Sequence, residues 1–184
     1  MSNDPAQFLA RLVAILDATE VPYMVVGGVA AIAHGRPRTP QDVDVLVVLG
    51  GRDAKRLVAA FPADDWYAEE QAAVDAVRYQ SQFNVIDMTT GWKADLIVRS
   101  RDPFQLEEFA RRRLATISGV RAWVASPEDT IVAKLDWSRR SGGSERQLDD
   151  VRGIITVQGT SLDRGYIETW VGTLGLRDQW ERVR

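Results

Sequence analysis

The stretch from Tyr23 to Leu49 constrains the fold of this chain more than any other. It contains two apolar runs: one from Tyr23 to Val26, and a second that Asp42-Val43-Asp44 opens and that ends at Leu49. Each run borders on turn-forming residues. Short apolar runs next to glycine and proline are typical of buried strands. We therefore expect a strand, a turn at Gly27 and Gly28, a short helix, a loop and a second strand.

Two carboxylates, Asp42 and Asp44, stand where the second apolar run begins. Residues two apart in a strand point to the same face, so the sequence places both acids side by side. Like charges in this arrangement raise one another's pKa unless a cation lies between them. Hard divalent cations such as Mg²⁺ take oxygen ligands and bridge to phosphates, so this pair is a candidate Mg²⁺ site.

The step Gly27–Gly28 suits the binding of a phosphate. Glycine lets the backbone approach a ligand closely, and the first N–H groups of the following helix favour an anion. A phosphate cradle beside a metal pair suggests nucleotide chemistry. The alternative is that the glycines only form a turn and that the carboxylates only mark the exposed start of a strand.

Thirteen residues separate Gly28 from Asp42, and with this spacing the stretch resembles the signature of the DNA polymerase β-like nucleotidyltransferase superfamily. The wider run GGVAAIAHGRPRTPQDVDVLV is similar to small bacterial nucleotidyltransferases, especially the AbiEii-type toxins of toxin–antitoxin systems. The resemblance implies an α/β or α+β nucleotidyltransferase fold, in which a small mixed β-sheet is flanked by helices. It also implies a core over residues 1–125 and a C-terminal helical bundle over residues 126–184.

A third carboxylate is expected on a hairpin formed by Phe83–Met88 and Trp92–Val98, around a turn that contains glycine. Asp95 interrupts the second of these apolar runs, which is costly unless the carboxylate is solvated, paired or bound to a metal. The resembled family has its third acid in this kind of apolar context, and Asp95 matches it. Asp87 is the rival candidate, and a lone charge on an edge strand is the alternative for both.

The sequence becomes helical after residue 126, where Ser126 and Pro127 form a strong helix start. A lysine on the first of these helices and an acid on the next resemble the AbiEii-type pattern, which carries over to Lys134 and Asp150. The resemblance implies that Lys134 contacts nucleotide phosphates and that the acid supports the site. Asp149 adjoins Asp150, so the register stays open, and the alternative is a surface Lys–Asp pair of little energetic value.

Other elements follow from periodicity and from capping residues. We expect helices over about 5–16, 52–60, 103–113, 127–138, 145–157, 163–173 and 176–183, and short strands over 114–117 and 120–124. The acidic segment 62–76 has less regular periodicity, which favours a solvated loop or a short helix.

Composition limits the function. The net charge of −3 argues against a strongly basic nucleic-acid binder, and the absence of cysteine excludes disulfides, thiolate zinc sites and a cysteine nucleophile. The N-terminus has no signal-peptide pattern, and no apolar stretch is long enough to span a bilayer, so we expect a cytoplasmic protein without a membrane partner.

The resemblance implies a nucleotidyltransferase that moves a nucleotide from an NTP to an acceptor hydroxyl with Mg²⁺ or Mn²⁺. The acceptor is a tRNA, a protein or a small molecule, and an antitoxin is a possible partner. Asp42, Asp44 and Asp95 would hold the metal ions. The residues expected at the nucleotide are Gly27, Gly28, Arg36, Arg38, Thr39, Lys134 and Asp150. The alternative is a non-catalytic, antitoxin-like regulatory protein that keeps the fold.

Overall fold

The computed structural model describes residues 4–35, 37 and 39–184. Within these residues the chain forms one mixed seven-stranded sheet with the strand order β3-β4-β5-β2-β1-β7-β6. The strands are β1 (Tyr23–Val26), β2 (Val43–Val47), β3 (Trp66–Ala68), β4 (Gln82–Asp87), β5 (Lys93–Val98), β6 (Arg113–Ile117) and β7 (Val120–Val124). The expected α/β or α+β fold with a mixed sheet is confirmed.

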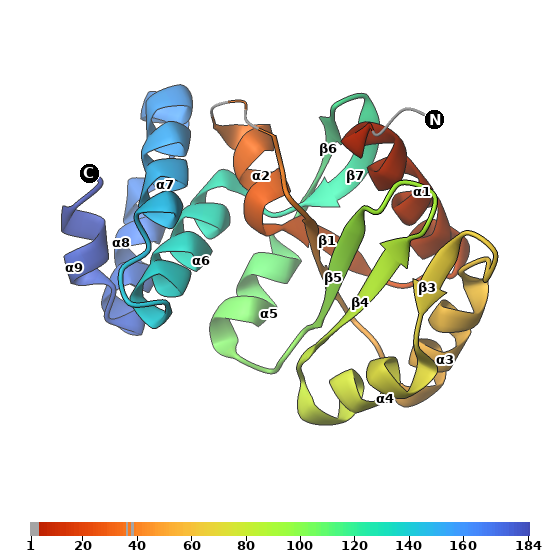
Figure 1. Ribbon diagram of the computed structural model, residues 1–184. Coiled ribbons are helices and arrows are strands. Elements are labelled where there is room, and N and C mark those ends of the chain that lie inside the picture. Colours follow the sequence, from red (N-terminus) through yellow and green to blue (C-terminus); the bar gives the residue numbers. More distant parts are fainter. Residues whose placement is uncertain (1–3, 36, 38) are drawn as a thin grey trace.

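Helices lie on both faces of the sheet and continue into a helical region at the C-terminus (Figure 1). The helices are α1 (Pro5–Ala18), α2 (Gly27–His34), α3 (Gly51–Ala60), α4 (Glu70–Tyr79), α5 (Pro103–Ala110), α6 (Pro127–Arg140), α7 (Glu145–Gln158), α8 (Arg164–Leu174) and α9 (Arg177–Glu181). A short 3₁₀ turn, Gly159–Ser161, joins α7 to α8. None of the helices among the described residues combines the length and the apolar character that crossing a bilayer requires.

Three groups of buried apolar side chains hold these layers together. The largest lies between one face of the sheet and the helices α1, α3 and α4. A smaller group on the opposite face joins Met24, Leu46, Phe109 and Ala125. The third fills the helical region and includes Ala31 of α2, so the helix that begins at the glycine step is packed against both halves of the chain.

The strand pairing brings distant parts of the sequence to one end of the sheet. Strand β2 is antiparallel to β1, so its start returns to the end of β1 and Val26 faces Asp44. Strand β5 is parallel to β2, so the starts of these two strands are neighbours. The end of β1 and the starts of β2 and β5 therefore share one edge region.

Local sequence signals explain the helix starts. The side chain of Asp4 accepts a hydrogen bond from the Ala6 N–H at the start of α1. Ser126 accepts one from the Asp129 N–H at the start of α6. Both caps are followed by proline in the first turn, as the sequence predicted.

The expectation of a loop or a short helix over residues 62–76 is met in part, because the segment contains most of α4, but it missed the strand β3. Three apolar side chains among its acidic residues are buried. Trp66 packs against Phe8 and Phe61, with ring centroids 5.5 Å and 5.1 Å apart. Ala73 and Ala76 turn one face of α4 to the core. A three-residue edge strand is too short to produce a readable alternation.

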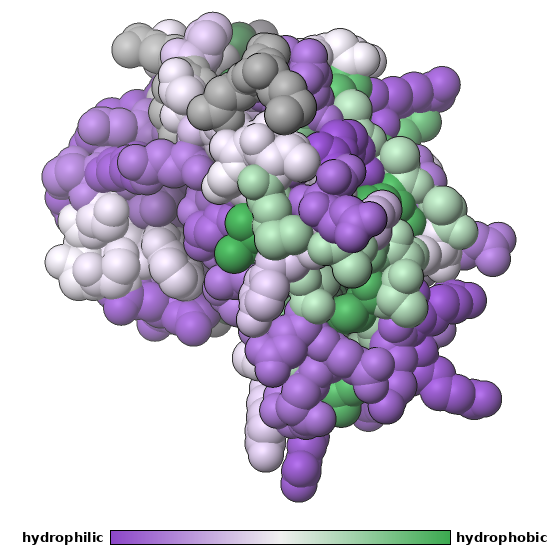
Figure 2. All heavy atoms as spheres, turned by 45° about the vertical axis from the view of Figure 1, so that its right-hand side comes forward, coloured by the Kyte–Doolittle hydropathy of each residue, from purple (hydrophilic) through white to green (hydrophobic). Residues whose placement is uncertain are grey.

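The surface that carries β3 and α4 faces water. Figure 2 turns the right-hand side of Figure 1 forward and shows hydrophilic side chains over most of the margin, with smaller hydrophobic areas between them. Tyr67, Tyr79 and Met88 are among the large exposed side chains of the chain.

Candidate active site

The carboxylates of Asp44 and Asp95 belong to neighbouring parallel strands and are register partners. Paired residues of adjacent strands point to the same face of the sheet. Asp42 lies two residues before Asp44, just ahead of β2. The starts of β2 and β5 are therefore neighbours, and Asp44 and Asp95 lie side by side there. Their side chains point to the face of the sheet opposite the largest core.

Asp87 lies elsewhere. Its side chain is fully buried and accepts hydrogen bonds from Arg11 at 2.8 Å and from the hydroxyl of Thr89 at 2.6 Å. Burial acts to raise the pKa of Asp87, but the hydrogen bonds from Thr89 and the charge of Arg11 outweigh it and lower the pKa. It shares its face of β4 with the buried Phe83 and Val85, so it is a structural carboxylate.

Gly27 makes room for Asp44. A Cβ built on Gly27 would lie 2.0 Å from Oδ2 of Asp44, and the backbone of Gly27 has φ +62°. Both conditions favour glycine, since other residues rarely adopt this φ. The next N–H, that of Gly28, is hydrogen-bonded to Asp44 and acts to lower the pKa of its carboxyl group. The backbone of Gly27 and Gly28 therefore packs against and hydrogen-bonds to the Asp44 carboxylate.

Asp44 is electrostatically crowded. Burial first, then the negative charges of Asp42 and Asp95, raise the pKa of Asp44 to about 6. The charge of Lys134, on α6, acts in the opposite direction and reaches Asp44 from the helical region. The three acids are therefore close enough to repel one another, which is the condition that a cation relieves.

Lys93 supplies a positive charge at this place. Its Nζ lies 3.0 Å from Oδ1 and 3.3 Å from Oδ2 of Asp95. The hydrogen bond to Asp95, and then the charges of Asp95, Asp42 and Asp44, raise the pKa of Lys93 against the opposing effect of burial. The sequence interpretation missed this residue, although it lies two positions before Asp95 and therefore on the same strand face.

Lys134 of α6 and Asp150 of α7 form the ion pair that the sequence led us to expect. Nζ of Lys134 lies 2.7 Å from Oδ2 of Asp150 and donates to Oε1 of Gln147 at 2.7 Å. Asp149 points elsewhere and pairs with Arg152 at 2.7 Å, so the register that the sequence left open is Asp150. Gln147 was not expected, but it precedes Asp150 by three residues and therefore shares its helix face.

The loop between α2 and β2 lies against α7. Arg146 donates to Oε1 of Gln41 at 2.7 Å, and Gln158 donates to the carbonyl of His34 at 2.8 Å. Thr39 is exposed in this loop. Arg36 and Arg38, which were expected at the triphosphate, lie outside the described residues.

Asp42, Asp44 and Asp95 offer the type of ligand atom that a divalent cation binds, but their side chains are not arranged as a metal site in this structure. Carboxylate oxygens are the ligands that Mg²⁺ prefers, and the crowding of Asp44 shows that this group of acids favours a neutralising cation. Yet within residues 4–35, 37 and 39–184, no three or more His, Asp or Glu side chains are grouped so that they could hold a metal ion as they stand. The ammonium group of Lys93 acts as a counter-charge there instead.

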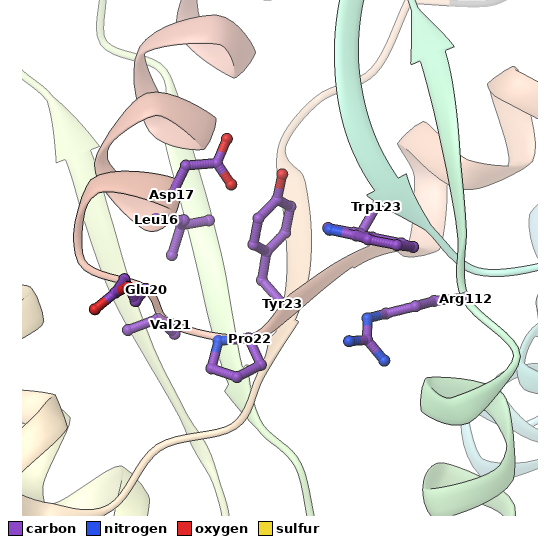
Figure 3. A pocket seen from close by; sticks show the side chains of 8 residues that line it. All are labelled: Leu16, Asp17, Glu20, Val21, Pro22, Tyr23, Arg112 and Trp123. Atoms are coloured by element: carbon purple, nitrogen blue, oxygen red, sulfur yellow. The ribbon is translucent and has the colours of Figure 1, made fainter.

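Two hollows lie near these elements. One, of about 730 Å³, borders α7 and is lined in part by Asp149, Asp150 and Thr156. The other, of about 130 Å³, lies at the opposite end of β1 from the glycine step, between Tyr23, Arg112 and Trp123 (Figure 3). Only the first touches a residue of the candidate site.

No protein-family model matches the chain, and a search among curated proteins finds no relative. Solved structures do resemble it. The solution structure of the antibiotic-resistance factor ANT(2'')-Ia is similar with a TM-score of 0.64 and 14% identity, covering 99% of this chain and 97% of that one. A crystal structure of ANT(2'')-Ia in complex with adenylyl-2''-tobramycin gives a TM-score of 0.59 and 16% identity, covering 93% and 97%.

An antigenic nucleotidyltransferase-like protein from Paracoccidioides brasiliensis is similar with a TM-score of 0.55 and 22% identity, covering 82% of this chain and 73% of that one. At these identities the likeness is one of fold. It extends over nearly the whole chain in ANT(2'')-Ia, including the helical region. The chain therefore has the fold found in nucleotidyltransferases.

Proposed function

We propose that this chain is a metal-dependent nucleotidyltransferase that transfers a nucleoside monophosphate from an NTP to an acceptor hydroxyl, with Mg²⁺ or Mn²⁺. The observation that carries the proposal is the pairing of Asp44 with Asp95 on adjacent parallel strands, beside a Gly27 whose lack of a side chain leaves room for Asp44. Its setting in a nucleotidyltransferase fold supports it.

Each residue has a role in this proposal. Asp42 and Asp44 would hold the metal that binds the triphosphate, and Asp95 would help hold a second metal near the acceptor hydroxyl. Bound metal would supply Lewis-acid stabilisation of the negative charge that develops on the phosphates. The backbone at Gly27 and Gly28 would lie close to the phosphates.

Lys134 would contribute positive charge from across the sheet edge. Its charge already influences Asp44, and Asp150 and Gln147 hold its Nζ at 2.7 Å. The acceptor hydroxyl would give its proton to Asp95 as its oxygen attacks the α-phosphorus; the bond to the β-phosphate oxygen breaks, and pyrophosphate leaves. Arg36 and Arg38 would add positive charge against the triphosphate, and Thr39 would help to shape the loop.

The acceptor is a tRNA, a protein or a small molecule. A small molecule has one point in its favour, since ANT(2'')-Ia has been solved with adenylyl-2''-tobramycin. The sequence resemblance to AbiEii-type toxins favours a role as the toxin of a toxin–antitoxin pair, with an antitoxin as its partner. The hollow beside Asp150 offers space for part of a substrate.

A transfer assay tests the proposal. Purified protein is incubated with each α-³²P-labelled NTP and Mg²⁺, together with tRNA, a protein extract or a small-molecule extract in separate reactions. We expect label in one acceptor class, and pyrophosphate in equal amount. The matched control is Asp44→Asn, which should transfer nothing, while Asp87→Asn should transfer at a rate near that of the wild type once folding is verified.

The alternative, a non-catalytic nucleotide-binding or antitoxin-like protein, predicts a different result. It would bind an NTP in calorimetry without transferring label to any acceptor, and Asp44→Asn would leave a partner protein bound. Label transferred equally by the wild type and by Asp44→Asn would contradict the proposed site.

A further inference from the structure

The ammonium group of Lys93 lies at the carboxylate cluster, which consists of Asp42, Asp44 and Asp95 and is where the proposed function needs a metal. It contacts both oxygens of Asp95, at 3.0 Å and 3.3 Å, and Asp95 is register partner to Asp44. Gln82 also donates to Asp95, with its Nε2 3.4 Å from Oδ2. The carboxylate that the proposed chemistry assigns to a metal therefore already holds a cation of the chain's own.

We propose that Lys93 is an internal counter-cation that occupies the carboxylate cluster in the metal-free protein and must leave when a divalent cation binds. The inference rests on the proposed function for the identity of the competing cation. It assigns Lys93 a positioning role: the ammonium group holds Asp95 in the metal-free protein and sets how tightly the metal binds.

The two lysines near the cluster differ in their freedom to move. The side chain of Lys93 is 41% exposed and that of Asp95 is 13% exposed, so Lys93 can swing into solvent while Asp95 stays on the sheet. The side chain of Lys134 is only 6% exposed and is held by Asp150 and Gln147. Lys93 is thus the displaceable charge, and Lys134 is the fixed one.

Charge repulsion makes the two states exclusive. An ammonium group within hydrogen-bond distance of Asp95 would lie a few ångströms from a metal ion bound to the same oxygens. Both groups are positively charged, so they would repel each other. A lysine is a compact, strongly hydrated charge on a flexible stem, so its release into water costs less than that of a fixed guanidinium fork. Metal should therefore bind weakly to the free protein and more tightly when a triphosphate adds negative charge.

Mn²⁺ binding to the free protein tests this without any turnover. Free Mn²⁺ is measured by electron paramagnetic resonance during titration of the wild type and of Lys93→Met, which keeps the length of the stem and removes the charge. We expect Lys93→Met to bind Mn²⁺ about tenfold more tightly, the size of a partly screened interaction between close unit charges. Lys93→Arg, which keeps the charge, should bind Mn²⁺ no more tightly than the wild type.

Lys55→Met is the matched control. Lys55 pairs with Glu70 at 2.7 Å on the outer helices α3 and α4, so its loss should leave Mn²⁺ affinity unchanged. Thermal melting gives a second readout: Lys93→Met should melt lower than the wild type without metal, and Mn²⁺ should raise its melting temperature by more. If Lys93→Met does not fold, Lys93→Gln removes the same charge and keeps a donor for Asp95.

The outcomes separate the inference from the proposed function. Wild type that binds Mn²⁺ with the same affinity as Lys93→Met, or more tightly, overturns the role of Lys93 and leaves the metal site standing. If neither protein binds Mn²⁺ and Asp44→Asn changes nothing, the metal site and the role of Lys93 are overturned together. Tighter binding in both Lys93→Met and Lys55→Met also overturns the inference, because it would reflect net charge alone.

Discussion

Gly27 lies so close to Asp44 that a Cβ on Gly27 would be 2.0 Å from Oδ2 of that carboxylate and 2.8 Å from its Cγ. The contact crosses from the end of β1 to the start of β2, where Val26 and Asp44 are register partners. The place of the carboxylate therefore depends on the absence of a side chain one residue after its cross-strand partner.

Gly27→Ala should displace the Asp44 carboxylate and also place a non-glycine residue at φ +62°. We expect a loss of stability of about 1–2 kcal/mol from the backbone alone, and a larger loss of Mn²⁺ affinity and transfer rate. Thermal melting, Mn²⁺ titration and the labelled transfer assay measure these effects.

Gly51→Ala is the control for this prediction. A Cβ on Gly51 meets nothing within 4 Å, and the residue starts α3 away from the carboxylates. The control should melt as the wild type does or slightly higher, with full activity. A Gly27→Ala protein with unchanged Mn²⁺ affinity would show that Asp44 does not contribute to a metal site.

Asp44→Asn should abolish transfer without destabilising the metal-free protein. The pKa of Asp44 is raised to about 6, above its usual 3.8, so its ionisation costs stability as pH rises through that range. Asparagine removes the repulsion with Asp42 and Asp95. Above about pH 6 the variant should melt no lower than the wild type, as measured by calorimetry without metal.

Asp87→Asn should show the reverse behaviour. Asp87 is fully buried and pairs with Arg11 at 2.8 Å, so the change removes one partner of an ion pair and should cost about 3 kcal/mol. Chemical denaturation measures this loss, and the transfer rate of the folded fraction should stay near that of the wild type. An inactive but stable Asp87→Asn would reverse the assignment of the two acids.

Local patterns predicted much of this fold. Apolar runs and proline-marked helix starts predicted the strand, helix and strand of residues 23–49, the two hairpins and the C-terminal helices. The turn expected at Gly27 and Gly28 is instead the start of α2. The strand β3, within 62–76, was not predicted. The buried apolar side chains of this segment are those of Trp66, Ala73 and Ala76, too few and too far apart to outweigh the acidic residues between them.

The candidate site was harder to predict because its geometry depends on pairing between distant segments. Nothing local in β2 says that it will lie parallel to β5, yet this pairing puts Asp95 rather than Asp87 beside Asp44. The choice of Asp150 over Asp149 depends likewise on how α7 packs against α6. The sequence could have placed Lys93 beside Asp95, since residues two apart in a strand share a face. The hydrogen bond between them also depends on the conformation of the Lys93 side chain, which the sequence does not determine.

Lys134→Met should weaken the binding of NTP about tenfold or more, because it removes a nearly buried positive charge that acts on the candidate site. The loss also removes the ion pair of 2.7 Å between Lys134 and Asp150, so a lower melting temperature is expected. Isothermal titration with ATP, GTP, CTP and UTP measures the affinity. Lys134→Arg keeps the charge and should retain more affinity than Lys134→Met, whereas equal affinity in all three proteins would remove Lys134 from the nucleotide site.

Glu108, on α5, should make stability depend on pH. Burial, and then the charges of Asp129 and Asp102, raise the pKa of Glu108 from 4.5 to about 8. A carboxyl group with a raised pKa in the folded state binds its proton more tightly there than in the unfolded chain. Its contribution is therefore fully present below pH 4.5 and is lost as pH rises through about 8.

Glu108→Gln resembles the protonated form at every pH, so it should remove this dependence. The variant and the wild type should have similar free energies of unfolding at the acidic end, and the variant should be more stable above pH 8 by on the order of 4 kcal/mol. Urea denaturation at a series of pH values measures the difference. Glu107→Gln, at the exposed neighbouring position, should follow the wild-type curve; if Glu108→Gln followed it as well, Glu108 would be ionised in the folded protein at no cost in stability.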